Sequence, residues 1–169
     1  MSSESYLAEI VAIVPAIIPV DLSTADNNGD WVSMKNYDHC TIMFFAAIGT
    51  AGQDPVFKLQ QAKDVAGTGI KDLLFTTIYH KAGALLTAVS DFTKAVQAAA
   101  TSYVNTDHAE VQKLYAVEID AAMLDIANGF DCVQLSVADV GANAQLGCGL
   151  YILSRARYKA ATVESAIVD

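Results

Sequence analysis

The sequence predicts an all-β fold: an antiparallel β-sandwich or jelly roll with an extended N-terminal arm and at most short helices. About eight apolar or alternating segments follow one another at intervals of roughly 10 to 20 residues, which is typical of such folds. Turns rich in glycine, asparagine and aspartate separate these segments. Residues 40–48 are apolar on both strand faces, whereas residues 56–65 alternate, and this contrast favours two packed sheets.

Length and charge limit the domain count and the class of partner. The 169 residues are enough for one domain with a substantial core. We expect an arm over residues 1–20, a sandwich over 21–160 and a tail over 161–169. Ten basic and nineteen acidic residues give a net charge of -9, so the chain repels phosphate backbones and nucleic acid is not an expected partner.

The first twenty residues are apolar and allow two interpretations. Glu9, Pro15 and Pro19 interrupt the apolar run, which is too short to span a bilayer, and no basic region precedes it. We therefore expect neither a signal peptide nor a membrane anchor. The segment is either a first edge strand packed on the core or an arm that reaches a neighbouring subunit, because exposed apolar surface marks interfaces.

Two loops resemble ligand sites only superficially. Residues 21–30, DLSTADNNGD, space Asp26, Asn28 and Asp30 like calcium ligands, but the glycine is misplaced and Tyr37 stands where the closing glutamate belongs. The GTG triplet at residues 67–69 lacks both GK[ST] and GxGxxG. We predict a solvated turn at each place.

The two-residue period of a strand assigns each face of the expected sheets. Residues 40–48 turn one apolar face to the core, and we expect Met43 and Phe45 on the other face to be covered by an outer layer or a partner. Phe57 and Leu59 point inward from the next strand. The inward face of residues 40–48 comprises Cys40, Ile42, Phe44, Ala46 and Ile48.

The later strands follow the same pattern. We expect a strand at residues 70–80 with Leu73, Phe75, Thr77 and Tyr79 on one face, and strands at 111–119, 130–140 and 146–153. Residues 98–100 are the most helix-tolerant part of the chain. The rival prediction is a mixed fold with helices at residues 7–13 and 91–102.

No pattern in the sequence points to catalysis, a cofactor or a metal. Cys40, Cys132 and Cys148 show no metal-ligand spacing, and we expect reduced, buried thiols. The three histidines form neither HxH nor HExxH, and no GxSxG elbow exists. His39 and Cys40 are adjacent in one strand and therefore face opposite ways. We expect a binding or structural protein rather than an enzyme.

Several phrases of the sequence resemble small virion proteins encoded beside the major capsid protein of tailed bacteriophages. These phrases are IVPAIIPVDL, NNGDWVSMKNY, GTAGQDPVFKLQQAKDVAGTG and NGFDCVQLSVADVGANAQLGCGLYILSRARY. The resemblance spans residues 10–158. It implies a capsid decoration (cement) protein, made in the bacterial cytoplasm, that binds the major capsid protein on the capsid exterior and stabilises the head as a homotrimer.

Other assignments stay open: another virion part, such as a tail-tube or head–tail joining protein, or, in a different class, a ligand- or carbohydrate-binding sandwich or an unrecognised enzyme. Arg155 and Arg157 are the polar docking residues that we expect, because they belong to the only basic cluster. The apolar contacts that we expect in an assembly are Tyr6, Leu7, Ile10, Val11, Ile13, Ile17 and Ile18 of the arm and Met43 and Phe45 of the two-sided strand.

Overall fold

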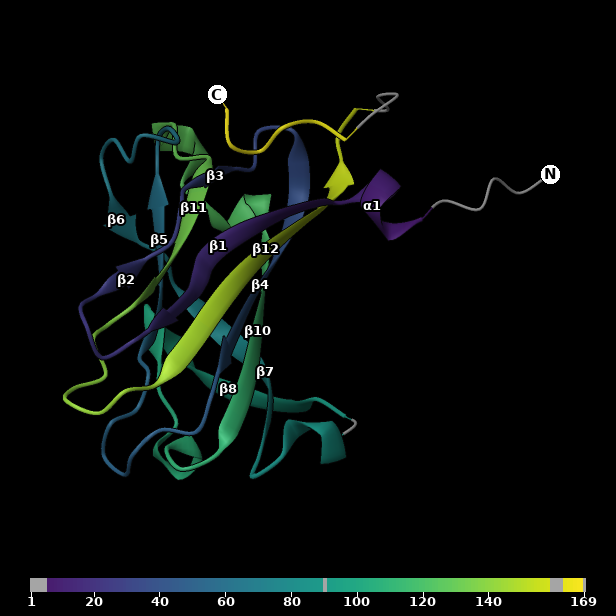
Figure 1. Ribbon diagram of the computed structural model, residues 1–169. Helices are drawn as coiled ribbons and strands as arrows, with labels where there is room; N and C mark the ends of the chain where they lie inside the picture. The colour runs from purple at the N-terminus through teal and green to yellow at the C-terminus, as the bar shows by residue number, and fades with distance from the viewer. Residues whose placement is uncertain (1–5, 90, 159–162, 169) are drawn as a thin grey trace.

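A computed structural model, which describes residues 6–89, 91–158 and 163–168, confirms the all-β prediction. Two antiparallel sheets pack face to face (Figure 1). The first sheet has the strand order β1 (Ala12–Asp21), β12 (Leu146–Ala156), β4 (Tyr37–Ala46), β10 (Gln112–Asp120), β7 (Phe75–Gly83) and β8 (Thr93–Ala100). The second sheet has the order β2 (Asn27–Asn28), β11 (Cys132–Val137), β5 (Phe57–Ala62) and β6 (Lys71–Asp72).

Short elements complete the sandwich. β3 (Val32–Ser33) pairs with β11, and β9 (Ser102–Tyr103) pairs with β5. The described α-helix is a single turn, α1 (Leu7–Ile10), and no helix of the described residues is long and apolar enough to cross a membrane. The 3-10 turns are η1 (Leu86–Ala88), η2 (Thr106–His108), η3 (Ala121–Met123) and η4 (Ile126–Asn128).

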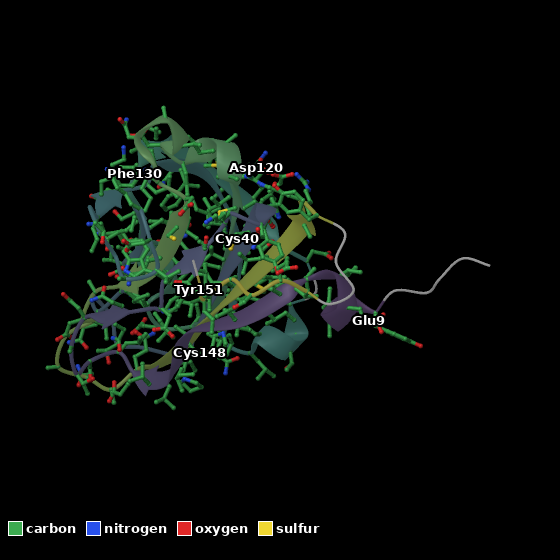
Figure 2. All side chains as sticks on the ribbon, turned by 90° about the horizontal axis from the view of Figure 1, so that it is seen from above. Glu9, Cys40, Asp120, Phe130, Cys148 and Tyr151 are labelled. Atoms are coloured by element: carbon green, nitrogen blue, oxygen red, sulfur yellow. The ribbon has the colours of Figure 1, made fainter. Side chains whose placement is uncertain are left out.

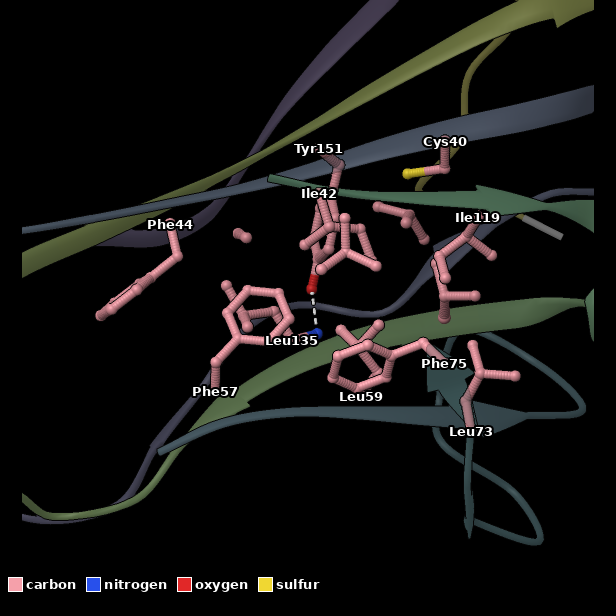
Figure 3. Close-up of a cluster of buried hydrophobic side chains, with 14 of the residues drawn as sticks. Cys40, Ile42, Phe44, Phe57, Leu59, Leu73, Phe75, Ile119, Leu135 and Tyr151 are labelled. Atoms are coloured by element: carbon pink, nitrogen blue, oxygen red, sulfur yellow. Dashed lines mark hydrogen bonds between the residues drawn. The ribbon is translucent and has the colours of Figure 1, made fainter. Parts of the chain in front are cut away.

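The core lies between the sheets and follows the predicted alternation along β4 up to Ala46, where the strand ends. Ile48, which was also expected to face inward, is 50% exposed. Phe44 of β4 packs edge-on against Phe57 of β5, with 6.2 Å between ring centroids, and Phe57 packs in the same way against Phe75. Val133, Leu135 and Val137 of β11 point inward, and Figure 3 shows Leu135 facing Ile42 and Tyr151 across the interior. Fully buried members from β4, β5 and β10 include Cys40, Ile42, Phe44, Ala46, Leu59 and Ile119.

A tyrosine from the first sheet completes hydrogen bonding in the second sheet. β3 pairs with β11 at residues 132–133 and β2 pairs with it at residues 136–137, which leaves the middle of β11 without a strand partner on that side. The Leu135 amide donates to the Tyr151 hydroxyl oxygen at 2.8 Å (Figure 3), and the Gly29 amide donates to the Leu135 carbonyl. The Tyr151 hydroxyl therefore replaces a missing ladder acceptor.

The segment expected to form an N-terminal arm is largely a strand of the sandwich. β1 pairs with β12 from Ala12 to Asp21, with register shifts around Pro15 and Ile17. Among the described residues of this segment, α1 stands apart, and none of its residues is buried. The expected boundary at residue 20 thus falls at the end of a paired strand, because backbone pairing extends the sheet across both prolines.

The C-terminal segment also packs on the sandwich. The Ser33 amide donates to the Ala166 carbonyl at 2.7 Å, and the Tyr37 hydroxyl donates to the Glu164 carbonyl. Ala166 belongs to the core. Residues 161, 162 and 169 of the expected tail lie outside the described residues, whereas residues 163–168 form part of the domain.

The rival prediction of a helix at residues 91–102 was wrong, and so was one detail of the strand prediction. Residues 91–102 contain strand β8, because pairing with β7 overrides the helix preference of its alanines. The strand expected at residues 70–80 is divided between β6 in the second sheet and β7 in the first. Leu73 and Phe75 are buried, but the register shifts between Phe75 and Thr77, so Thr77 does not continue the buried face.

Candidate interaction surface

The outward face of the first sheet carries a continuous group of apolar side chains. Met43 pairs with Leu150, and Phe45 pairs with Cys148 on one side and with Leu114 on the other. At the sheet edge Ile13 pairs with Ile152. We call this group the outer patch and define it as Ile13, Met43, Phe45, Leu114, Cys148, Leu150 and Ile152.

The described part of the chain leaves the outer patch open to solvent. Phe45 is 38% exposed and Leu150 is 41% exposed, whereas Phe44, one residue earlier, is fully buried. Leu114 and Cys148 help to line a shallow hollow whose surface is almost entirely apolar. The inward face of β4 packs against the core as expected. The outward face of β4 keeps exposed apolar side chains that another chain can cover.

Ion pairs and hydrogen bonds border the outer patch where β4 begins and β10 ends. Glu118 accepts a hydrogen bond from the Thr41 hydroxyl at 2.7 Å and lies 3.0 Å from His39 Nε2. Arg155 lies 3.3 Å from Asp120. An apolar centre with a polar border is the usual composition of a protein–protein interface.

The two arginines expected to dock a partner already contact carboxylates of neighbouring strands. Arg155 pairs with Asp120, and Arg157 Nε lies 2.8 Å from Asp38. Arg155 also has a φ of 53°, the left-handed conformation that L residues rarely adopt. Both guanidinium groups remain partly exposed, so a partner meets paired rather than isolated cations.

The other predicted contact residues fall into three groups. Ile13, Met43 and Phe45 lie in the outer patch, and Ile18 is exposed on β1. Figure 2 shows α1, marked by Glu9, outside the body of the sandwich, and the exposed side chains there are Tyr6, Leu7 and Ile10. Val11 and Ile17 are buried, because they turn toward the body of the domain, and they offer no surface to a partner.

A polar cluster that the sequence did not predict lies where β10 begins, beside β7 and η2. The His80 and His108 rings are 4.9 Å apart, and His108 Nδ1 lies 3.1 Å from the Tyr115 hydroxyl. Lys113 is fully buried and donates to the Ala109 carbonyl at 3.3 Å. Burial lowers the pKa of His80, of His108 and of Lys113. A sequence motif could not have revealed this cluster, because its residues come from β7, η2 and β10, which are separated in the sequence.

The cysteines and histidines provide no metal-binding group within the described residues. Cys40, Cys132 and Cys148 are free thiols, and burial raises the pKa of Cys40. His39 contacts Glu118 and Ser154 on the outward face, while Cys40 points into the core, so the two face opposite ways as predicted. Across the described ranges, no three His, Cys, Asp or Glu side chains converge to hold a metal ion.

Comparison with known proteins gives no family for this chain. No protein-family model matches it, and no curated protein sequence matches it. The functional interpretation therefore depends on the surfaces described above and on the resemblance of the sequence phrases.

Proposed function

We propose that this chain is a structural virion protein that binds the major capsid protein on the outer surface of a phage capsid and stabilises the assembled head. The observation that carries the proposal is the apolar turn α1, which stands outside the sandwich with Leu7 60% exposed and Ile10 51% exposed. Exposed apolar side chains of this kind mark a docking element. The sequence phrases that resemble phage decoration proteins support the same assignment.

The docking surface that we propose combines α1 with the paired arginines. α1 contacts the beginning of β1 and also β12, the strand that ends with Arg155 and Ala156. Tyr6, Leu7 and Ile10 supply apolar contact, and Arg155 and Arg157 supply directional polar contact. The net charge of -9 suits a protein that covers the exterior of a shell and does not touch packaged nucleic acid.

Stabilisation follows from binding the assembled shell in preference to its dissociated subunits. A ligand present at a hundredfold excess over its Kd stabilises the state that it binds by about 2.7 kcal/mol per site. A homotrimer, which we also propose, engages several capsid subunits at once and raises the effective concentration of each contact.

The test uses expanded, undecorated shells of the major capsid protein encoded beside this chain. Wild type and the double variant Leu7→Glu/Ile10→Glu are compared by co-sedimentation, with Ile70→Glu/Leu85→Glu as the matched control. All four positions are more than half exposed, so thermal stability should not change. We expect the α1 variant to lose about thirtyfold to a thousandfold in affinity, because burying each of the two apolar side chains contributes about 1–2 kcal/mol.

Three results would contradict the proposal. Wild type that fails to saturate the shells would contradict shell binding. Equal affinities for the α1 variant and the control would show that α1 is not the docking element. Decorated shells that dissociate at the same temperature as undecorated ones would contradict the stabilising role. A six-membered ring in solution would favour a tail-tube or joining protein instead.

A further inference from the structure

We infer that a hollow beside the second sheet is a binding site for a neutral carbohydrate. The hollow has a volume of about 370 Å³, within the range of roughly 300–1,000 Å³ that is usual for ligand sites. It lies between the loop after β2, the turn after β5, the middle of β11 and the C-terminal segment. The side chains that line it are Asn28, Asp30, Trp31, Val65, Gln134 and Ile167. None of these residues belongs to α1 or to the outer patch, so the inference goes beyond the proposed docking to a shell.

Trp31 supplies an aromatic wall of the hollow. It is the only tryptophan of the chain, and it is partly exposed in the loop between β2 and β3. The backbone of Gly67, which has a φ of 80°, lies close against the indole, since a Cβ at Gly67 would be 2.7 Å from Trp31 Nε1. This contact holds the ring in place. The C–H groups on one face of a sugar ring are apolar and slightly positive, so they pack on the electron-rich face of an indole.

The polar groups of the hollow are held in place by hydrogen bonds. Gln134 is 8% exposed, and its Nε2 donates to the Gly29 carbonyl at 2.6 Å. The Ser136 hydroxyl donates to Asn28 Oδ1 at 2.7 Å. These bonds do not use Gln134 Oε1, which is an acceptor, or Asn28 Nδ2, which is a donor. A sugar hydroxyl both donates and accepts, so it matches an acceptor and a donor that are fixed in the same hollow.

The charge of the lining favours a neutral ligand. Among the described residues that line the hollow, Asp30 is the one ionised side chain, and no lysine or arginine is present. A phosphate or a nucleotide would therefore be repelled. A purely apolar ligand would leave the polar groups of Asn28, Asp30 and Gln134 without hydrogen-bond partners. A sugar has an apolar face for Trp31 and hydroxyl groups for the three polar side chains.

The polar surface continues from the hollow across the second sheet. Gln134 pairs with Gln60 in the register of β11 and β5. Gln60 Nε2 donates to Asp72 Oδ1 of β6 at 3.2 Å. This row of hydrogen-bonding groups lies on the outward face of the sheet, so a second sugar ring that follows the first meets polar partners. We therefore expect a disaccharide to bind more tightly than a single sugar ring.

The first experiment titrates the full wild-type chain with maltose, cellobiose, lactose and N,N′-diacetylchitobiose, and with glycerol as a non-specific control. Because the chain has a single tryptophan, its fluorescence emission reports directly on the hollow. Isothermal titration calorimetry measures the same binding independently. We expect at least one disaccharide to change the emission in a saturable way, with a Kd of about 1 mM or tighter. We expect glycerol to have no saturable effect.

The second experiment repeats the calorimetry with Asp30→Ala and Trp31→Ala, and uses Asp107→Ala as the matched control. Asp30 and Asp107 are both exposed, but Asp107 lies on η2, outside the lining of the hollow. We expect Asp30→Ala to weaken disaccharide binding by about tenfold, because a hydrogen bond to a charged group is lost. Trp31→Ala should weaken it by at least as much, and the control should bind as wild type does.

A wild-type chain that none of the four disaccharides saturates would overturn the inference, whether or not a variant fails to fold. An equal response to glycerol would also overturn it, as would wild-type affinity in both Asp30→Ala and Trp31→Ala. Leu7→Glu/Ile10→Glu, the α1 variant, should bind the disaccharide as wild type does. A chain that binds a disaccharide and ignores shells would support this inference and contradict the proposed function, and the reverse result would do the opposite.

Discussion

Tyr151→Phe tests the most specific contact between the two sheets. The substitution keeps the ring in the core and removes only the hydroxyl oxygen that accepts the Leu135 amide at 2.8 Å. Because β2 and β3 leave the middle of β11 without a partner on that side, the amide then has no replacement acceptor from either strand. Tyr151 is fully buried and Leu135 is fully buried, so water cannot reach the amide without opening the core.

The cost follows from leaving a buried donor unsatisfied. Removing one partner of a buried hydrogen bond costs about 1–3 kcal/mol. In a domain of this size, each 1 kcal/mol lowers the melting temperature by about 2–4 °C. We therefore expect Tyr151→Phe to lower the free energy of unfolding by about 2 kcal/mol, a large fraction of the 5–15 kcal/mol typical of a domain.

Urea unfolding at neutral pH measures this change, and Tyr158→Phe is the matched control. Tyr158 is 68% exposed, so we expect the control to change the free energy of unfolding by less than about 0.5 kcal/mol. Hydrogen exchange should show faster exchange of the Leu135 amide in Tyr151→Phe alone. A Tyr151→Phe protein as stable as the control, with an unchanged Leu135 exchange rate, would refute the structural role of this hydroxyl.

Two further predictions concern acid stability and the close packing of β12. Burial lowers the pKa of His80 and of His108, so the unfolded chain binds more protons than the folded chain below about pH 6.5. The free energy of unfolding should therefore fall as the pH drops from about 7 to 5, and His80→Gln/His108→Gln should reduce this slope; an unchanged slope in urea titrations would contradict the assignment. Gly149→Ala should cost about 1–3 kcal/mol by thermal unfolding, because its Cβ would lie 2.7 Å from Leu135 Cδ2 in the core. Gly149→Ala with wild-type stability would show that Leu135 moves aside freely.

The core strands were predictable because local alternation and tertiary burial agree there. Phe44 and Leu135 show this agreement, since each occupies the inward position that its two-residue period gives and each is fully buried. β8 was less predictable, because its alanines favour a helix and only pairing with β7 makes the segment a strand. The switch of sheet between β6 and β7 and the register shift after Phe75 both depend on long-range strand pairing, which no local pattern encodes.

The candidate surfaces were predictable only where the sequence pattern of a single strand identifies the surface residues. Met43 and Phe45 were identified because β4 is apolar on both faces, but their neighbours Leu114 and Leu150 become part of the patch only through cross-strand register. Ile17 looked like an arm residue because the pairing of β1 with β12 is a long-range contact. The polar cluster around His108 was not identified for the same reason.

The most direct test of the proposed function is an electron-microscopy map of the particle that carries this protein. Our proposal predicts density for the sandwich on the outside of the capsid shell, with α1 directed toward the major capsid protein. Density for this chain inside the tail, at the head–tail junction, or nowhere on the particle would contradict it.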